Sequence, residues 1–168
     1  MVHRMRLERY RLTLRCTRPL LGAALGGLAA GALDILYAFA QAGLNGRSPL
    51  RVLQAVASGL LGPVAFEGGI AAGLIGLACH FVITLAAAGI FLVGYEHCSI
   101  QRKNPVLAGV IFGALVYAFM HAVVLPLSAI PFKMTYSPWI IAQGLAVHIF
   151  LVGVPIALCI RRFALAGN

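Results

Sequence analysis

The sequence predicts an all-α integral membrane protein, a bundle of four spanning helices with a short amphipathic helix at the interface between spans one and two. Of its 168 residues, 61% are hydrophobic and 10% are charged, whereas a soluble domain carries about 25% charged residues. The chain contains four long apolar runs, and a helix needs about 20 apolar residues to cross a bilayer. These runs use most of the length, so we expect one transmembrane domain over residues 1–168.

Basic residues gather before the first apolar run, in a segment that we expect to be a surface helix or arm at the inner leaflet. They are Arg4, Arg6, Arg9, Arg11, Arg15 and Arg18. Such clusters set membrane orientation and attract anionic lipid headgroups. Nucleic-acid binding is the alternative that a basic cluster raises, and the membrane setting argues against it.

The first span is expected over residues 19–44, with Pro19 in its first turn, where the missing N–H of proline costs nothing. Two G-x-x-x-G patterns follow, and glycine lets the backbones of two helices approach closely. The four glycines expected to form this packing surface are Gly22, Gly26, Gly27 and Gly31.

A single acid, Asp34, lies near the middle of this first span. A carboxylate in lipid is costly and should face a protein partner. Gly27, Gly31, Tyr37 and Gln41 are spaced three or four residues apart on either side of it and share its helix face. We therefore expect Asp34 to point into the bundle.

A short helix is predicted over residues 49–61, after the Asn45-Gly46 turn. Ser48-Pro49 has the chemistry of a helix start, and Gly62-Pro63 that of a helix end. Thirteen residues are too few to cross the membrane, so we expect this helix to lie in the interface or to dip into the membrane and return.

The second span is predicted over residues 64–95. Glu67 falls in its expected first turn, where a carboxylate suits the helix dipole; the alternative role is cation entry. His80 lies well inside the span, and Thr84 follows one turn later on the same face.

The third span is predicted over residues 105–130 and opens at Asn104-Pro105. Tyr117, His121 and Ser128 share one face, and Pro126 is expected to kink the helix near its outer end.

The fourth span is predicted over residues 137–160. It opens at Ser137-Pro138, carries His148 and ends at Arg161-Arg162. Counting lysine and arginine on each side gives ten basic residues inside and three outside, which places both termini in the cytoplasm.

Four cysteines are present without a C-x-x-C pair, and we interpret them as free thiols.

One ionisable side chain per span falls at a similar depth. With a rise of about 1.5 Å per residue, Asp34, His80, His121 and His148 lie about 20–24 Å from the inner ends of their spans. We therefore expect the four residues to form one layer in the middle of the bundle.

Three interpretations of this layer remain open. In the first, the histidines and Asp34 are structural and hydrogen-bond neighbouring helices. In the second, they carry protons or a cation, since histidine titrates near neutral pH; Glu67, Tyr37 and Gln41 then belong to the same pathway. In the third, two histidines hold haem, or Asp34, His80, His121 and His148 hold a metal ion.

Motifs for other chemistry are absent from the sequence. There is no C-x-x-C-H for covalent haem attachment, and no G-x-S-x-G or H-E-x-x-H for hydrolysis. The sequence therefore does not favour an enzyme, and a protein without a cofactor is the first expectation.

The C-terminal third of the chain resembles the YagU-type family of small bacterial inner-membrane proteins. The resemblance rests on PVLAGVIFGALVYAFMHAVVLPLSAIP and AVHIFLVGVPIALCIRR, in which the matching positions are His121, Pro126, His148, Arg161 and Arg162. It implies a multi-pass protein of the bacterial inner membrane with a link to acid tolerance.

The preferred prediction is a membrane protein that handles protons or a cation, with Asp34, His80 and His148 first and His121 next. A haem- or metal-binding module is the alternative. A further alternative is a structural protein that forms homo-oligomers through its glycine face. The substrate is not predicted.

Overall fold

The computed structural model of the protein describes residues 2–133 and 136–165, with side chains from Arg18 onward except that of Glu96. The described chain is helical and contains no strand. Its long helices are α1 (Val2–Leu44), α3 (Gly69–His97) and α5 (Pro105–Phe119). Its shorter ones are α2 (Pro49–Leu61), α4 (Ser99–Lys103), α6 (Leu125–Leu127), α7 (Pro138–Val147) and α8 (Val154–Leu165).

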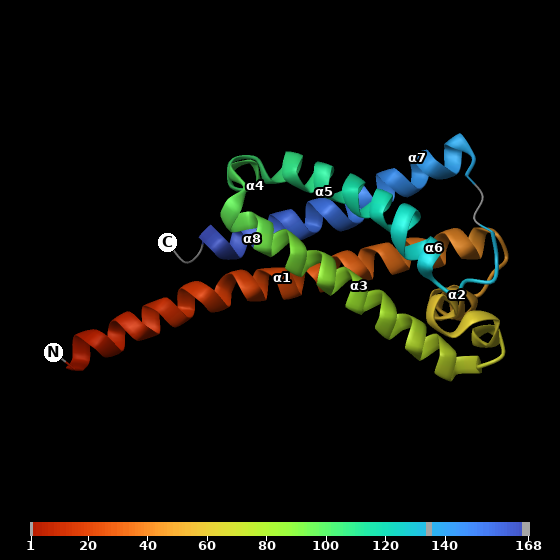
Figure 1. Ribbon diagram of the computed structural model, residues 1–168, viewed down its shortest axis with the longest axis horizontal. Coiled ribbons are helices and arrows are strands. Elements are labelled where there is room, and N and C mark those ends of the chain that lie inside the picture. Colours follow the sequence, from red (N-terminus) through yellow and green to blue (C-terminus); the bar gives the residue numbers. More distant parts are fainter. Residues whose placement is uncertain (1, 134–135, 166–168) are drawn as a thin grey trace.

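The long helices lie roughly side by side and alternate in direction (Figure 1). α1 and α5 run one way, whereas α3 and the α7–α8 segment return. α4 and the end of α8 lie at one end of the bundle, and α2 and α6 lie at the other. α2 is seen nearly end on, so its axis crosses the direction of the long helices (Figure 1).

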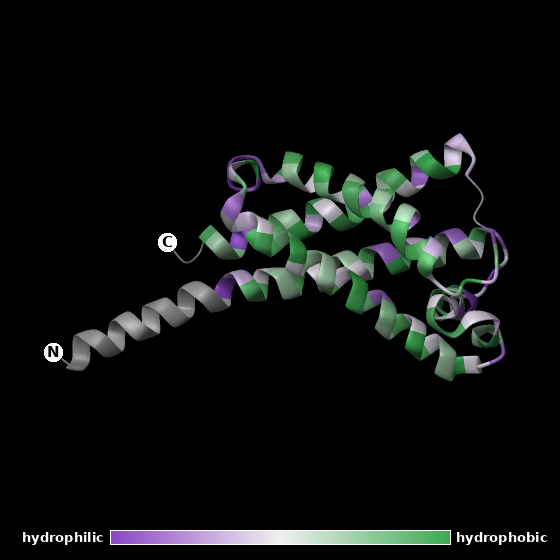
Figure 2. Cartoon of the chain, in the orientation of Figure 1, coloured by the Kyte–Doolittle hydropathy of each residue, from purple (hydrophilic) through white to green (hydrophobic). Residues whose placement is uncertain are grey.

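Five helices of the described chain are long and apolar enough to cross a membrane, judged by length and composition. The sequence predicted four. The fifth is Pro49–Phe66, because a 3-10 helix, η1 (Gly62–Phe66), continues the thirteen residues of α2. From Arg18 onward, apolar residues cover most of the length of the helices, and polar ones gather mainly at the connections (Figure 2). Helices of this kind indicate a multi-pass membrane protein.

The predicted helix starts at three Pro-containing sites are confirmed. The side-chain oxygens of Ser48, Asn104 and Ser137 accept hydrogen bonds from backbone N–H groups three residues later, at 3.3, 3.1 and 3.3 Å. Each satisfies one of the unpaired donors of a first helical turn. The predicted end of α2 is confirmed as well, since Gly62 closes it with a φ of 66°.

Pro19 does not lie in a first helical turn as expected, although the part of α1 that is apolar enough to cross a membrane, Arg18–Leu44, begins beside it. α1 is one continuous helix, and Pro19 lies inside it. The fixed φ of proline is helical, so the residue removes one hydrogen bond without ending the helix.

The second span also begins later than predicted. η1 occupies residues 62–66, and α3 begins at Gly69, whose φ of 53° breaks the helical path. Glu67 is therefore not in the first turn of α3; it follows η1 and is exposed. The polar loop expected after the span folds partly into α4.

Two π-helical turns interrupt the last two spans. η2 (Met120–Val124) and η3 (His148–Gly153) precede Pro126 and Pro155. A proline clashes with the carbonyl four residues earlier, and a widened turn relieves that clash. The third span ends at Leu127 rather than residue 130, because Ser128 has an extended backbone. The fourth continues to Leu165 rather than residue 160.

The end of the bundle near α4 is tightly filled, and we call it the packed half. Its core residues come from α1, α3, α5, η3 and α8: Ala23, Ala30, Ala87, Ala88, Phe91, Tyr95, Ala108, Val152, Ile156, Ala157 and Ile160. Most are small, so the helix backbones approach closely.

Glycines set these close approaches. A Cβ on Gly22 would lie 3.1 Å from the Cα of Ile160 in α8, and a Cβ on Gly27 would lie 3.0 Å from the Cα of Leu85 in α3. The two G-x-x-x-G patterns therefore face different helices: Gly22 and Gly26 face α8, whereas Gly27 and Gly31 face α3. Another close crossing is between α5 and η3, where a Cβ on Gly153 would overlap the carbonyl oxygen of Gly109.

Cys79, Cys98 and Cys159 are free thiols, as predicted. Cys16 and the five arginines before Arg18 lie outside the described side chains.

Candidate functional site

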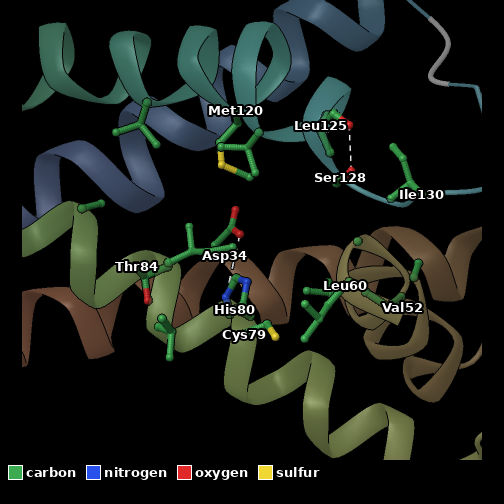
Figure 3. A pocket seen from close by; sticks show the side chains of 18 of the residues that line it. Asp34, Val52, Leu60, Cys79, His80, Thr84, Met120, Leu125, Ser128 and Ile130 are labelled. Carbon is green, nitrogen blue, oxygen red and sulfur yellow. Dashed lines mark hydrogen bonds and ion pairs between the residues drawn. The ribbon is translucent and has the colours of Figure 1, made fainter. Parts of the chain in front are cut away.

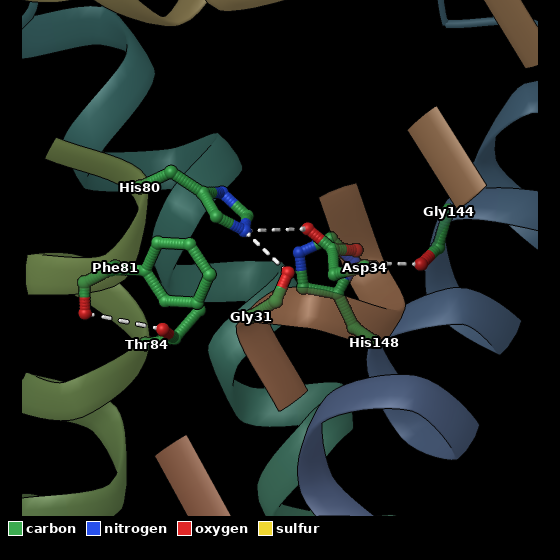
Figure 4. A network of polar contacts seen from close by, with 7 residues as sticks. All are labelled: Gly31, Asp34, His80, Phe81, Thr84, Gly144 and His148. Atoms are coloured by element: carbon green, nitrogen blue, oxygen red, sulfur yellow. Dashed lines mark hydrogen bonds and ion pairs between the residues drawn. The ribbon is translucent and has the colours of Figure 1, made fainter. Parts of the chain in front are cut away.

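Asp34 of α1 and His80 of α3 meet where these two helices cross (Figure 4). The Nε2 atom of His80 donates a 2.9 Å hydrogen bond to the carbonyl oxygen of Gly31 and lies 4.0 Å from Oδ2 of Asp34. A separation of 4.0 Å is too long for a hydrogen bond, so the carboxylate is an electrostatic neighbour of the ring. Gly31 allows this approach because it has no side chain to displace Thr84 and Phe81.

His121 and His148 form a second group around Tyr117. The ring of Tyr117 lies 4.1 Å from that of His121 and 5.3 Å from that of His148, between centroids. The ring of Tyr136 lies 5.9 Å from that of His121. A Cβ on Gly144 would lie 2.7 Å from the Tyr117 ring, so this glycine provides the space that the ring fills.

Each of these two histidines lies at the beginning of a π-helical turn. Nδ1 of His121 donates to the carbonyl of Tyr117 at 2.9 Å, and Nδ1 of His148 donates to that of Gly144 at 2.8 Å. A carbonyl oxygen can only accept, so both Nδ1 atoms carry hydrogen, and in the neutral form of each ring Nε2 is the atom with a lone pair. π-helical turns occur frequently at functional sites.

One cavity of about 780 Å³ connects the two groups. Asp34, His80, His121 and His148 all line it, together with apolar residues of α2, α3, α5 and η2. Figure 3 shows Asp34 pointing across the cavity from α1, with Met120 and Leu125 on the opposite wall. We call the part of the bundle around this cavity the cavity half.

α2 supplies a wall of the cavity that the sequence did not indicate. Its residues Val52, Val56 and Leu60 line the space. The sequence predicts a helix that lies in the interface or dips into the membrane and returns, and neither prediction includes a cavity wall. The neighbouring Gly73 and Gly76 on α3 were the available signal: a Cβ on Gly76 would overlap the carbonyl of Leu53, so α2 lies directly on α3.

Polar contacts on two sides hold α2 in place. Nε2 of Gln54, which is buried, donates to the carbonyl of Gly69 at 3.1 Å. The Arg51 guanidinium donates to the carbonyl of Phe66 at 3.3 Å and lies 4.9 Å from the centroid of its ring. On the other side, the N–H of Ala129 donates to the carbonyl of Gly59 at 2.9 Å. This last bond joins α2 to the segment after α6 at the edge of the cavity.

Three other sequence candidates lie away from the cavity lining. Tyr37 and Gln41 are half-buried on α1 beyond Asp34, and Glu67 is exposed after η1. Their part in a pathway stays a prediction.

The described residues provide no preformed site for the metal interpretation. Among the described residues, no group of three or more histidine, cysteine, aspartate or glutamate side chains is placed to hold a metal ion. Asp34 and His80 form one pair, while His121 and His148 each contact the Tyr117 ring.

The arrangement can bind and exchange a proton or a positive charge. One carboxylate and three imidazoles line the same cavity, and the helices that carry them are of membrane-spanning length. No known family, curated protein or solved structure matches the chain.

Proposed function

We propose that this protein is a multi-pass membrane protein that handles protons or a cation at the Asp34–His80 pair. The observation that carries the proposal is the position of the pair on the wall of a cavity that His121 and His148 also line. Ionisable residues inside membrane helices are costly and are most often retained for ion or proton pathways.

The proposed topology has four crossings and places α2 across the outer end of the bundle. Its support is the direction of α2 in Figure 1 and the position of α4 and the end of α8 at the opposite end. That end carries Arg102 and Lys103 of α4, and Arg161 and Arg162 of α8. The positive-inside rule then places both termini in the cytoplasm. A bacterial inner membrane and a relationship to the YagU-type family belong to the same proposal.

The histidines extend the proposed site beyond the pair. Imidazole can gain or lose a proton between pH 5 and 8. The rings of His80, His121 and His148 line the same cavity as Asp34. A proton that leaves the carboxylate therefore has neighbouring acceptors on the same wall.

The alternatives receive less support from the contacts. A structural protein that assembles through its glycine face requires that face to be free, but Gly22 and Gly26 pack against α8, and Gly27 and Gly31 pack against α3. A haem or metal module requires converging ligands, and the histidines are divided between two groups.

The test is dissipation of an imposed pH gradient in vesicles that contain the purified protein. Wild-type protein is expected to collapse the gradient faster than protein-free vesicles, and Asp34→Asn is expected to return the rate to that of protein-free vesicles. His80→Gln should have a smaller effect in the same direction. His80 is an electrostatic neighbour of the Asp34 carboxylate, whereas Asp34 itself carries the proton.

Two variants make this test specific. Asp34→Glu keeps the acid and should retain part of the rate. His97→Gln changes an exposed histidine at the end of α3 and should match the wild type. An unchanged rate in folded Asp34→Asn would show that the proposed function is wrong.

A further inference from the structure

The size of the cavity is that of an organic ligand site. Small-molecule sites measure about 300–1,000 Å³, and the cavity measures about 780 Å³. One water molecule takes about 30 Å³ of liquid volume, so a bare inorganic ion would occupy a minor part of it. Apolar side chains such as Val56, Ile83, Val124 and Leu125 form most of the lining, which favours an apolar body in the remaining volume.

The imidazole and hydroxyl donors on the lining are already used within the chain, and the Cys79 thiol is only a weak donor. Nε2–H of His80 donates to Gly31, and the Nδ1–H groups of His121 and His148 donate to carbonyls of their own helices. The Thr84 and Ser128 hydroxyls also donate to carbonyls of their own helices, at 3.2 and 2.7 Å.

The groups that remain are acceptors. Asp34 offers its carboxylate oxygens, and each neutral imidazole keeps one ring nitrogen with a lone pair. Among the described lining residues, Asp34 is the one acid, and the described lining contains no lysine or arginine. A site with surplus acceptors and one negative charge favours a ligand that brings donors and a positive charge.

We propose that the cavity binds a protonated amine with an apolar body. The ammonium group donates hydrogen bonds to Asp34 and to free imidazole nitrogens, and the apolar body lies between α2 and the α5–α6 segment. This inference rests on the proposed function, because it uses Asp34 as the cation site. It names the substrate class of that site.

A consequence of this assignment is competition between the amine and a proton. A protonated carboxyl group cannot pair with an ammonium ion, so binding of the amine releases a proton from any Asp34 that carries one. Exchange of one positive charge for another leaves the charge inside the membrane unchanged, which avoids the cost of an unpaired ion in lipid.

The experiment compares three probes with the same apolar body and different head groups. They are 1-naphthylmethylamine, 1-naphthylmethanol and 1-naphthaleneacetic acid, titrated into the full-length protein in detergent and followed by calorimetry in two buffers of different ionisation enthalpy. The amine is expected to bind at least about tenfold tighter than the alcohol, since a charge-assisted hydrogen bond contributes about that factor. The acid is expected to bind most weakly.

Variants connect this selectivity to the site. Asp34→Asn should make the amine and the alcohol equal, whereas His97→Gln should leave the preference intact. If Asp34→Asn does not fold, Val124→Phe serves instead: it places a ring in the cavity, leaves Asp34 in place, and should weaken binding of the amine. Equal binding of all three probes to the wild type, or preference for the acid, would overturn the inference.

The two proposals fail separately. If gradient dissipation depends on Asp34 but the probes show no head-group preference, the amine site is wrong and the proton function stands. If the amine binds through Asp34 but neither proton release nor gradient dissipation occurs, the amine site stands and the proposed proton handling is wrong.

Discussion

The packed half and the cavity half are built from the same helices but in different ways. Around Gly109, Gly113 and Gly153, the α5 and η3 backbones touch with no side chain between them. In the cavity half, α2 touches α3 through Gly76, but larger side chains line a space of about 780 Å³ beside that contact. Within a bilayer, helices gain little from burying apolar surface, so close packing must hold them together. One half supplies that packing, which allows the other half to remain hollow.

Burial along the helices agrees with this division. In the most apolar stretch of Arg18–Leu44, 39% of the residues are buried, compared with 6% for Pro105–Leu127. α1 is therefore the central helix, and the third span packs mainly through its glycines. Changes that crowd those glycines should therefore be damaging.

The largest effect is expected from Gly153→Ala. The new Cβ would overlap the carbonyl of Gly109 and crowd Gly113, and backbone atoms cannot move aside as a side chain can. Overpacking of this kind costs about 1–3 kcal/mol. The measurement is reversible unfolding in mixed detergent micelles, followed by circular dichroism.

The matched control for this variant is Gly89→Ala, because a Cβ on Gly89 of α3 has no described neighbour within 4 Å. It should be neutral or stabilising. Equal loss of stability in both variants would contradict the assignment of the packed half as the source of stability.

A smaller effect is expected from Gln54→Leu in the cavity half. It removes the hydrogen bond to Gly69 and should cost about 1 kcal/mol. The change should act locally, so amide hydrogen exchange should accelerate in α2 and stay constant in α8. Faster exchange in both helices would mean that the two halves unfold as one unit.

The smallest effect, with the opposite sign, is expected from Gly59→Ala. Gly59 also lines the cavity, but a Cβ there would lie 3.7 Å from the Cβ of Ser128, an ordinary contact. Replacing a helical glycine by alanine should stabilise α2 by about 0.5–1 kcal/mol. Destabilisation comparable to that of Gly153→Ala would remove the distinction between the halves.

The sequence predicted the local chemistry of the fold better than its long-range contacts. Ser48, Asn104 and Ser137 identify helix starts because capping depends on residues three positions apart. The passage of α1 through Pro19 and the late start of α3 were missed, since composition does not specify where a helix tolerates an interruption.

The candidate site shows the same limit. Counting residues along each span placed Asp34 and the three histidines at one depth, because helical rise is constant. Which of them would meet could not be predicted, since it depends on how close the helices approach. The pairing of Asp34 with His80 requires the contact of Gly31 with α3, and the grouping of His121 with His148 depends on the Tyr117 ring that both contact.

The π-helical turn η2 also changes the direction in which the residues that follow it in the third span face. At about 100° per residue, an uninterrupted α-helix would place Leu125 about 180° from Val116, on opposite sides of the rod. Both residues nevertheless line the same cavity. The wider turn between them rotates each residue by less than an α-helical turn does, and so reduces this angular difference. The π-helical turn before Pro126 therefore affects which side chains of this span face the cavity.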